Sequence, residues 1–204
     1  RLKPLSRPEL PKQFLNLLRP DQSLLQKTFE RALFVTQASP GDIVIPHQII
    51  DYTWGRKSTY HEGEGCTVTH VDFTEPYDRC LRQMILLAAS DVGVPAHPGS
   101  VYAATQGPRL ETAAEINRLE RDGADVVGMT GMPEAVLARE LGVPYAALNL
   151  IANYAAGRAD SKDGISFEAI EGVLRESMQR VRLIIERLAA CYENGCAAGS
   201  NPPD

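Results

Sequence analysis

Short apolar runs alternate with amphipathic stretches from about residue 39 to about residue 190 of the chain. Runs of this length, bounded by turn-forming residues, are typical of buried strands. Four of them are predicted to be strands, at residues 43–45, 100–105, 125–127 and 145–151. Apolar residues at helical spacing predict four helices, at residues 81–89, 112–121, 133–141 and 166–190. Strands that alternate with helices indicate an α/β fold with a parallel or mixed sheet.

The first 38 residues differ in character from the rest of the chain. Pro4, Pro8, Pro11 and Pro20 break any long element there, so only one short amphipathic helix is expected, at residues 23–34. We therefore predict an atypical N-terminal segment over residues 1–38 and one domain over residues 39–190. Residues 191–204 are expected to be a disordered tail.

Composition and charge exclude several classes of protein. The 204 residues support one domain with a sizeable core, and a net charge of -5 without a basic block argues against a nucleic-acid or membrane-surface role. The sequence contains neither a long apolar run nor a signal-peptide pattern, so we expect a cytoplasmic protein. The cysteines lack metal-ligand spacing, so reduced thiols and no metal site are expected at Cys66, Cys80, Cys191 and Cys196.

Residues 128–156 carry the strongest indication of chemistry. Met129 and Thr130 fall where a strand is predicted to pass into the N-terminus of a helix, and Asn153 follows the next apolar run. A β-α-β unit would bring both turns to one edge of a parallel sheet, where ligands bind in such folds. Asn is disfavoured inside strands, so Asn153 is a candidate for a functional role.

Four blocks of sequence resemble the trimeric purine nucleoside phosphorylase family, and specifically its 5′-methylthionucleoside branch. The resemblance implies a single-domain α/β phosphorylase fold with a central mixed sheet flanked by helices. It also implies a homotrimer that takes a purine nucleoside and inorganic phosphate, with no other cofactor. The four blocks, in the order that the family has, are SPGDIVIPHQIIDYT (39–53), THVDFTEPYD (69–78), VYAATQGPRLETAAEI (101–116) and ADVVGMTGMPEAVLARELG (124–142).

The resemblance assigns the purine base to three residues, and their chemistry indicates which purine. Asn153 is the catalytic candidate, because its amide can donate to the N7 that gains charge and to the oxygen of a 6-oxopurine. Glu111 can accept the N1–H of hypoxanthine, whereas adenine has a bare N1. Leu110 would give the base an apolar surface. The alternatives are that Asn153 only caps a turn and that Glu111 only interacts with a helix dipole.

The resemblance places the sugar, the phosphate and the 5′-substituent on five further residues. Met129 would hold the ribose, and the Thr130 hydroxyl would bind phosphate at a helix N-terminus. His70 would reach the 5′-pocket of a neighbouring subunit, and Phe167 and Ile170 would line that pocket. The alternatives are an ordinary N-cap role for Thr130 and plain core packing for Phe167 and Ile170. Arg109 is expected to brace its loop and not to bind phosphate.

The N-terminal part departs from the family. The glycine-rich phosphate loop, the Arg-His pair and the N-terminal strands of the family have no counterpart here. A truncated or mis-started gene product, an omitted stretch of sequence and a remodelled N-terminus all fit this departure. Each of the three leaves the phosphate half of the site incomplete.

We expect phosphorolysis of 5′-methylthioinosine-type 6-oxopurine nucleosides, with purine salvage as its role. The products would be the purine base and 5-methylthioribose 1-phosphate. Phosphorolysis of methylthioadenosine or of inosine and guanosine is the alternative within the same enzyme class. A catalytically impaired paralogue, which only binds purine or assembles with a partner chain, is the alternative from another class.

Overall fold

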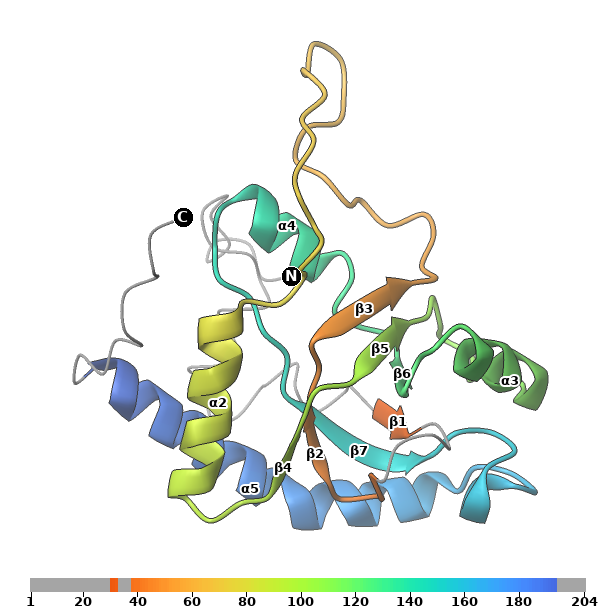
Figure 1. Cartoon of the computed structure of the whole chain (residues 1–204). Coiled ribbons are helices and arrows are strands. Elements are labelled where there is room, and N and C mark those ends of the chain that lie inside the picture. The colour runs from red at the N-terminus through yellow and green to blue at the C-terminus, as the bar shows by residue number, and fades with distance from the viewer. Residues whose placement is uncertain (1–29, 33–37, 194–204) are drawn as a thin grey trace, which may run out of the picture.

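The structure, a computed structural model, describes residues 30–32 and 38–193. In these residues one mixed sheet has the strand order β3-β5-β6-β1-β7-β2-β4 (Figure 1). Neighbouring strands are parallel except at the β1–β6 and β2–β7 pairs. The predicted α/β fold with a central mixed sheet is thus confirmed. The strands are β1 Glu30–Ala32, β2 Ile43–Ile45, β3 Gln48–Asp51, β4 Ala96–Pro98, β5 Val101–Ala104, β6 Val126–Gly128 and β7 Asn149–Tyr154.

Four α-helices in the described residues pack against this sheet, and all four predicted helices are confirmed. Asp78 caps the first of them by accepting from the Leu81 backbone N–H at 2.7 Å. Ser166 acts in the same way at the last helix, where the Ala169 N–H donates to its hydroxyl at 3.2 Å. The helices are α2 Arg79–Asp91, α3 Ala113–Arg121, α4 Glu134–Glu140 and α5 Phe167–Glu193, with a 3-10 turn η3 at Ala159–Ser161.

Alternating residues of the strands show which helix covers which face, because successive side chains point to opposite faces of a sheet. In β5, Tyr102 and Ala104 belong to the same buried cluster as Ala135 of α4. Ala103 between them packs instead with Ile116 of α3. Helices α3 and α4 therefore cover opposite faces of the sheet.

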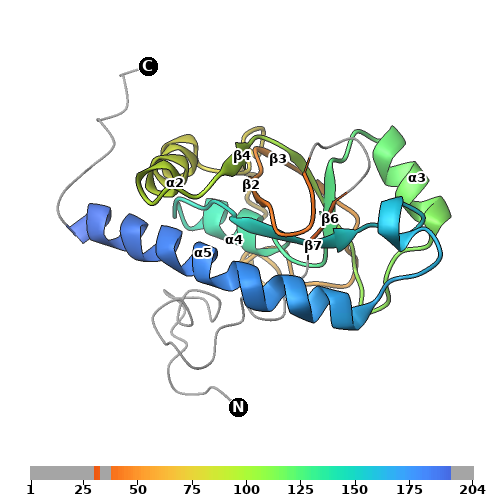
Figure 2. The same cartoon turned by 90° about the horizontal axis from the view of Figure 1, so that it is seen from below.

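Successive side chains of β2 also point to opposite faces of the sheet. Val44 lies in the cluster of α4, whereas Ile43 and Ile45 pack with Ile85 of α2 and Ile184 of α5. Helices α2, α3 and α5 thus share the face opposite α4. In Figure 1, α5 runs along the base and α4 lies near the top; seen from below in Figure 2, α2 and α3 lie at opposite ends.

Two element predictions are corrected. Residues 30–32 form β1 and are not helical; the rest of the helix predicted at 23–34 lies outside the described residues. The strand predicted at 145–151 is β7 at Asn149–Tyr154. Tyr145 is engaged elsewhere, because its carbonyl accepts from the Asp78 N–H at 2.7 Å and its ring stacks on Tyr77 with centroids 6.0 Å apart.

Strands β3 and β4 were not predicted. Strand β4 has only three residues and contains proline, and β3 follows a histidine in a stretch that reads as a loop. Both pair in parallel with a neighbour that supplies the context, β5 for β3 and β2 for β4. Residues 191–193, which were expected to belong to a disordered tail, are the last residues of α5, and the rest of that tail lies outside the described residues.

A loop over residues 52–78 joins β3 to α2 and projects far from the sheet (Figure 1). Residues 61–70 are all exposed. Loops of this length in a compact domain are usually functional. None of the helices in the described residues is long and apolar enough to cross a membrane.

Candidate functional site

The loop after β5 is fixed to the end of β6 by Thr105. The Thr105 backbone N–H donates to the Gly128 carbonyl at 2.7 Å. Its hydroxyl lies 2.6 Å from the Glu111 Oε1 and 3.1 Å from the same carbonyl. A hydroxyl has one proton, and the shorter contact is to the carboxylate, the stronger acceptor of the two, so the proton goes to Glu111. The Glu111 side chain, in a residue only 8% exposed, is therefore held beside the end of β6.

Gly107 brings the same loop against Met129. Its φ of +66° is in the left-handed region that glycine adopts readily. A Cβ at this position would lie 2.4 Å from the Met129 sulfur, which is closer than atoms can approach. The loop that carries Leu110 and Glu111 thus rests directly on the residue predicted to hold the ribose.

The Thr130 hydroxyl is held by a buried tyrosine. The Tyr102 hydroxyl lies 3.2 Å from the Thr130 hydroxyl and accepts from the Thr130 backbone N–H at 3.2 Å. Helix α4 begins later, at Glu134, and its N-cap is Pro133. The predicted position of Thr130 at a helix N-terminus is therefore wrong, and so is the alternative that it is an N-cap. The Thr130 hydroxyl is thus fixed by Tyr102 and not by the end of a helix.

Asn153 is the second-last residue of β7 and is 9% exposed. Its Nδ2 donates to the Tyr154 carbonyl at 2.6 Å, whereas its Oδ1 is buried and, in the described part of the chain, has no hydrogen-bond partner. Leaving a buried acceptor unpaired costs about 1–3 kcal/mol. The Asn153 side chain thus has a buried oxygen whose hydrogen-bonding capacity is unused in the described part of the chain.

The expectation that the turns after β6 and β7 share one edge of a parallel sheet is wrong. Arg31 in β1 pairs with Val127 on one side and with Asn153 on the other, and these pairings make β7 antiparallel to β6. The short α4 and the extended residues 143–148 do not return the chain to the start of β6. Asn153 consequently lies level with Val127, two strand spacings or roughly 10 Å away.

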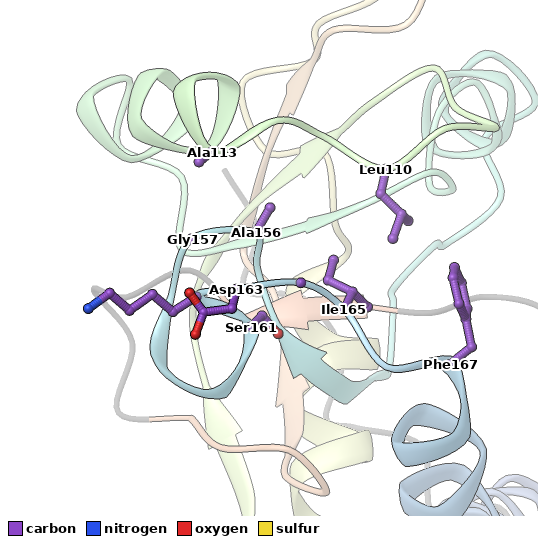
Figure 3. A pocket seen from close by; sticks show the side chains of 10 residues that line it. Leu110, Ala113, Ala156, Gly157, Ser161, Asp163, Ile165 and Phe167 are labelled. Atoms are coloured by element: carbon purple, nitrogen blue, oxygen red, sulfur yellow. The ribbon is translucent and has the colours of Figure 1, made fainter.

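A cavity of about 440 Å³ lies where the loop after β5 meets the segment after β7 (Figure 3). Its volume is in the range of small-molecule sites. Gly157 packs so closely on Ala113 that a Cβ would come within 2.9 Å of the alanine Cβ. The cavity therefore lies between the segment that follows Glu111 and the segment that follows Asn153. Its lining residues are Leu110, Ala113, Ala156, Gly157, Ser161, Lys162, Asp163, Gly164, Ile165 and Phe167.

The structure does not bring all of the predicted site residues to the cavity. Leu110 and Phe167 line the cavity, and Phe167 is 67% exposed. Glu111 directly follows the lining residue Leu110, and Asn153 comes three residues before the lining residue Ala156. Met129 and Thr130 are not lining residues; Met129 lies against Gly107, and Thr130 contacts Tyr102. Ile170 is buried and is not among the lining residues. His70 is exposed on the projecting loop and is also absent from the lining.

Two residues of this arrangement were not predicted, Thr105 and Tyr102. The stretch SVYAAT alternates in a way that directs the Tyr102 ring to one face, and Thr105 is a hydroxyl residue at the strand end. The one sequence signal for a polar contact of Thr105 is that an acid, Glu111, lies six residues further on in a glycine-containing loop. In the described residues, no group of three or more His, Cys, Asp or Glu side chains is arranged to hold a metal.

Arg109 braces the loop, as predicted. Its guanidinium makes two hydrogen bonds to the Glu115 carboxylate, at 2.8 and 2.7 Å. Glu115 and Thr112 also form a capping box at the start of α3. The Arg109 bonds, followed by the Thr112 backbone N–H, lower the pKa of Glu115 to about 2.

Comparison with known proteins extends the picture. The family model described as the phosphorylase superfamily matches residues 34–190. A protein of Xylella fastidiosa named "Probable S-methyl-5'-thioinosine phosphorylase" is 54% identical over 134 residues, which are 66% of this chain and 54% of that one. The 6-oxopurine nucleoside phosphorylase of Pyrococcus furiosus is 46% identical over 154 residues, 73% of this chain and 58% of that one.

A solved structure with the same fold is methylthioadenosine phosphorylase from Schistosoma mansoni in complex with adenine. It has a TM-score of 0.74 and 25% sequence identity, and the match covers 81% of this chain and 64% of that one. The present chain thus spans little more than half the length of the curated relatives that it matches.

Glu115→Gln should destabilise the protein only where the carboxylate is ionised. Because folding lowers the pKa of Glu115 from 4.5 to about 2, its contribution is present above about pH 4.5 and is lost as the pH falls towards 2. Solvent screening of this exposed pair limits the difference to about 0.2–1 kcal/mol at neutral pH. Urea unfolding of both proteins across this pH range measures it. Glu168→Gln, which removes an exposed carboxylate from the first turn of α5, is the matched control. A wild-type advantage that stays constant down to pH 2 would contradict the assignment.

Proposed function

The chain belongs to the phosphorylase superfamily, and from this membership we propose that it takes part in the phosphorolysis of 5′-methylthioinosine-type 6-oxopurine nucleosides. The products are the purine base and 5-methylthioribose 1-phosphate, with inorganic phosphate as the co-substrate and purine salvage as the role. The observation that carries the proposal is the buried Glu111 carboxylate, held by Thr105 in the loop that lines the cavity.

Glu111 and Asn153 together select a 6-oxopurine. The carboxylate of Glu111 accepts the N1–H of hypoxanthine, and its burial makes a bare adenine N1 an unfavourable neighbour. The free N–H of Asn153 donates to the 6-oxygen or to N7, while its unpaired Oδ1 accepts from a ligand N–H. The names of the Xylella and Pyrococcus relatives denote nucleosides of 6-oxopurines, which supports this choice. The Schistosoma protein was solved with adenine, which lacks the N1–H.

The reaction needs positioned donors and no covalent nucleophile. The sugar develops oxocarbenium character while phosphate approaches one face and negative charge grows on the purine. In our proposal, Asn153 stabilises that charge, Met129 supports the ribose and the Thr130 hydroxyl binds phosphate. The contact between Tyr102 and Thr130 supports this role, because it fixes the hydroxyl at a defined point beside Met129.

The 5′-methylthio group requires an apolar wall. Leu110, Ile165 and Phe167 supply one side of the cavity, and Ile170 is buried behind the first turn of α5. A buried 5′-hydroxyl would lack a partner against such a wall. We propose that His70 completes this pocket from the projecting loop of a neighbouring subunit in a homotrimer.

The base preference tests the proposed function. Hypoxanthine should bind about 10–100-fold more tightly than adenine, which corresponds to about 1–3 kcal/mol for a mispaired polar group. Isothermal titration calorimetry with both bases measures this ratio. Asn153→Asp should shift the preference towards adenine, with Glu111 limiting the gain. Asn117→Asp on the exposed surface of α3 is the control and should leave the ratio unchanged. Equal or reversed affinities would refute the assignment.

Assembly tests the proposed role of His70. Light scattering on the purified chain should return a trimer, because a site shared between subunits cannot form in a monomer. His70→Ala should weaken nucleoside binding in that trimer, whereas His61→Ala, on the same exposed loop, should not. A stable monomer with undiminished nucleoside affinity would rule out the shared site.

Turnover tests whether this chain is sufficient for catalysis. Phosphate needs several convergent donors, and the loss of one such donor typically costs about 10²–10³ in rate. The sequence lacks the family's glycine loop and Arg-His pair, so the 204-residue chain should show little phosphorolysis of methylthioinosine at saturating phosphate. Addition of a family-type N-terminal segment should restore activity. Turnover on the order of 1 s⁻¹ by the chain alone would contradict this expectation.

A further inference from the structure

Arg56 joins the two turns of the candidate site through a single guanidinium. From the loop after β3, its Nη2 donates to the carbonyls of Thr105 and Gln106, at 3.3 and 3.1 Å. The same nitrogen donates to the Met129 carbonyl at 3.1 Å, and Nη1 donates to the Met132 carbonyl. Three separate segments of the chain, with Arg56 on the first, therefore meet at one side chain.

Arginine makes more of these contacts than lysine could. The guanidinium is a planar group with five N–H donors, and it uses Nη2 for both turns, Nη1 for the Met132 carbonyl and Nε for the Gln106 side chain. A lysine ammonium has one nitrogen, so it could replace the contacts of Nη2 but not those of Nη1 and Nε as well. The Arg56 side chain is half-buried, and in the described residues its hydrogen-bond acceptors are four backbone carbonyls and the side-chain oxygen of Gln106. Its charge is therefore balanced by the carbonyl dipoles that converge at the ends of β5 and β6.

Two contacts that do not involve Arg56 show that these turns are packed as one unit. Gly107 leaves no room for a Cβ against Met129. Thr105 is bonded both to Gly128 and to Glu111. A shift of either turn would consequently move Glu111 relative to Met129 and Thr130.

We propose that Arg56 is a positioning residue, which fixes the distance between the turn that binds the base and the turn that binds the sugar and phosphate. This proposal rests on the proposed function of Glu111, Met129 and Thr130. It adds that base recognition depends on a side chain outside the cavity lining. Arg56 also ties the root of the projecting loop to the site, because Gln106 accepts from the Trp54 backbone N–H at 3.2 Å as well.

Hydrogen–deuterium exchange without ligand tests the joining of the turns independently of function. Arg56→Gln should raise exchange several-fold in residues 105–111 and 128–133 together, because both turns lose their shared donor. Arg56→Ala should behave alike, and added guanidinium ion should reverse its effect. Arg139→Gln is the matched control, since Arg139 donates to the Glu75 carbonyl and, among the described residues, has no hydrogen bond to either turn. A rise in one segment only, or no rise, would overturn the proposal.

Hypoxanthine affinity then tests the positioning role. In a double-mutant cycle, the effects of Arg56→Gln and Glu111→Gln on the dissociation constant of hypoxanthine should depart from additivity by about tenfold, because both substitutions disturb the same position of the base. Arg56→Lys, which keeps the charge and one donor nitrogen and guards against failure to fold, should recover only part of the affinity lost in Arg56→Gln. Additive effects, or an unchanged affinity with raised exchange, would overturn the role. A wild-type chain that binds no hypoxanthine would contradict the proposed function, while the exchange result would still decide whether Arg56 joins the turns.

Discussion

The burial of one carboxylate is the constraint on which the candidate site depends. Glu111 lies away from water, and the hydroxyl of Thr105 is the donor that makes its burial tolerable. That hydroxyl is held in place because the Thr105 N–H is bonded to the Gly128 carbonyl at the end of β6. The pairing of β5 with β6 thus determines where the carboxylate lies, and Gly107 then seats the loop on Met129. The position of this acid is in this way a consequence of strand register.

The sequence predicted best those elements whose signals are local. The helices predicted at 112–121 and 166–190 begin where Thr112 and Ser166 cap them, and the apolar runs of β2, β5 and β6 are strands. The strand at 145–151 was misplaced, because Tyr145 is held by residues of the long loop that are far away in sequence. Strand β3 was missed for a similar reason, since its pairing with β5 and not its composition makes it a strand.

The same difference between local and distant signals applies to the candidate site. Short blocks of sequence carry the resemblance that predicts Leu110, Glu111, Met129, Thr130 and Asn153 as site residues. The partners that fix them were missed, because Thr105, Tyr102 and Arg56 act across 6 to 76 residues of chain. The direction of β7 was also beyond the sequence, since it follows from the path of residues 143–148 and from pairing with β1. No local pattern encodes whether a strand enters a mixed sheet from one side or the other.

The loop over residues 52–78 consists of a root and a tip with different freedom to vary. At the root, Trp54 and Arg56 are bonded to the turns of the site, and Glu75 and Asp78 are bonded to Arg139 and Tyr145. At the tip, residues 61–70 are all exposed. In the course of evolution, insertions and deletions between residues 61 and 69 would therefore leave the turns after β5 and β6 undisturbed. A substitution at the tip alters an exposed surface, which includes the His70 that we propose for the neighbouring subunit's pocket, whereas a substitution at the root alters the turns of the candidate site itself.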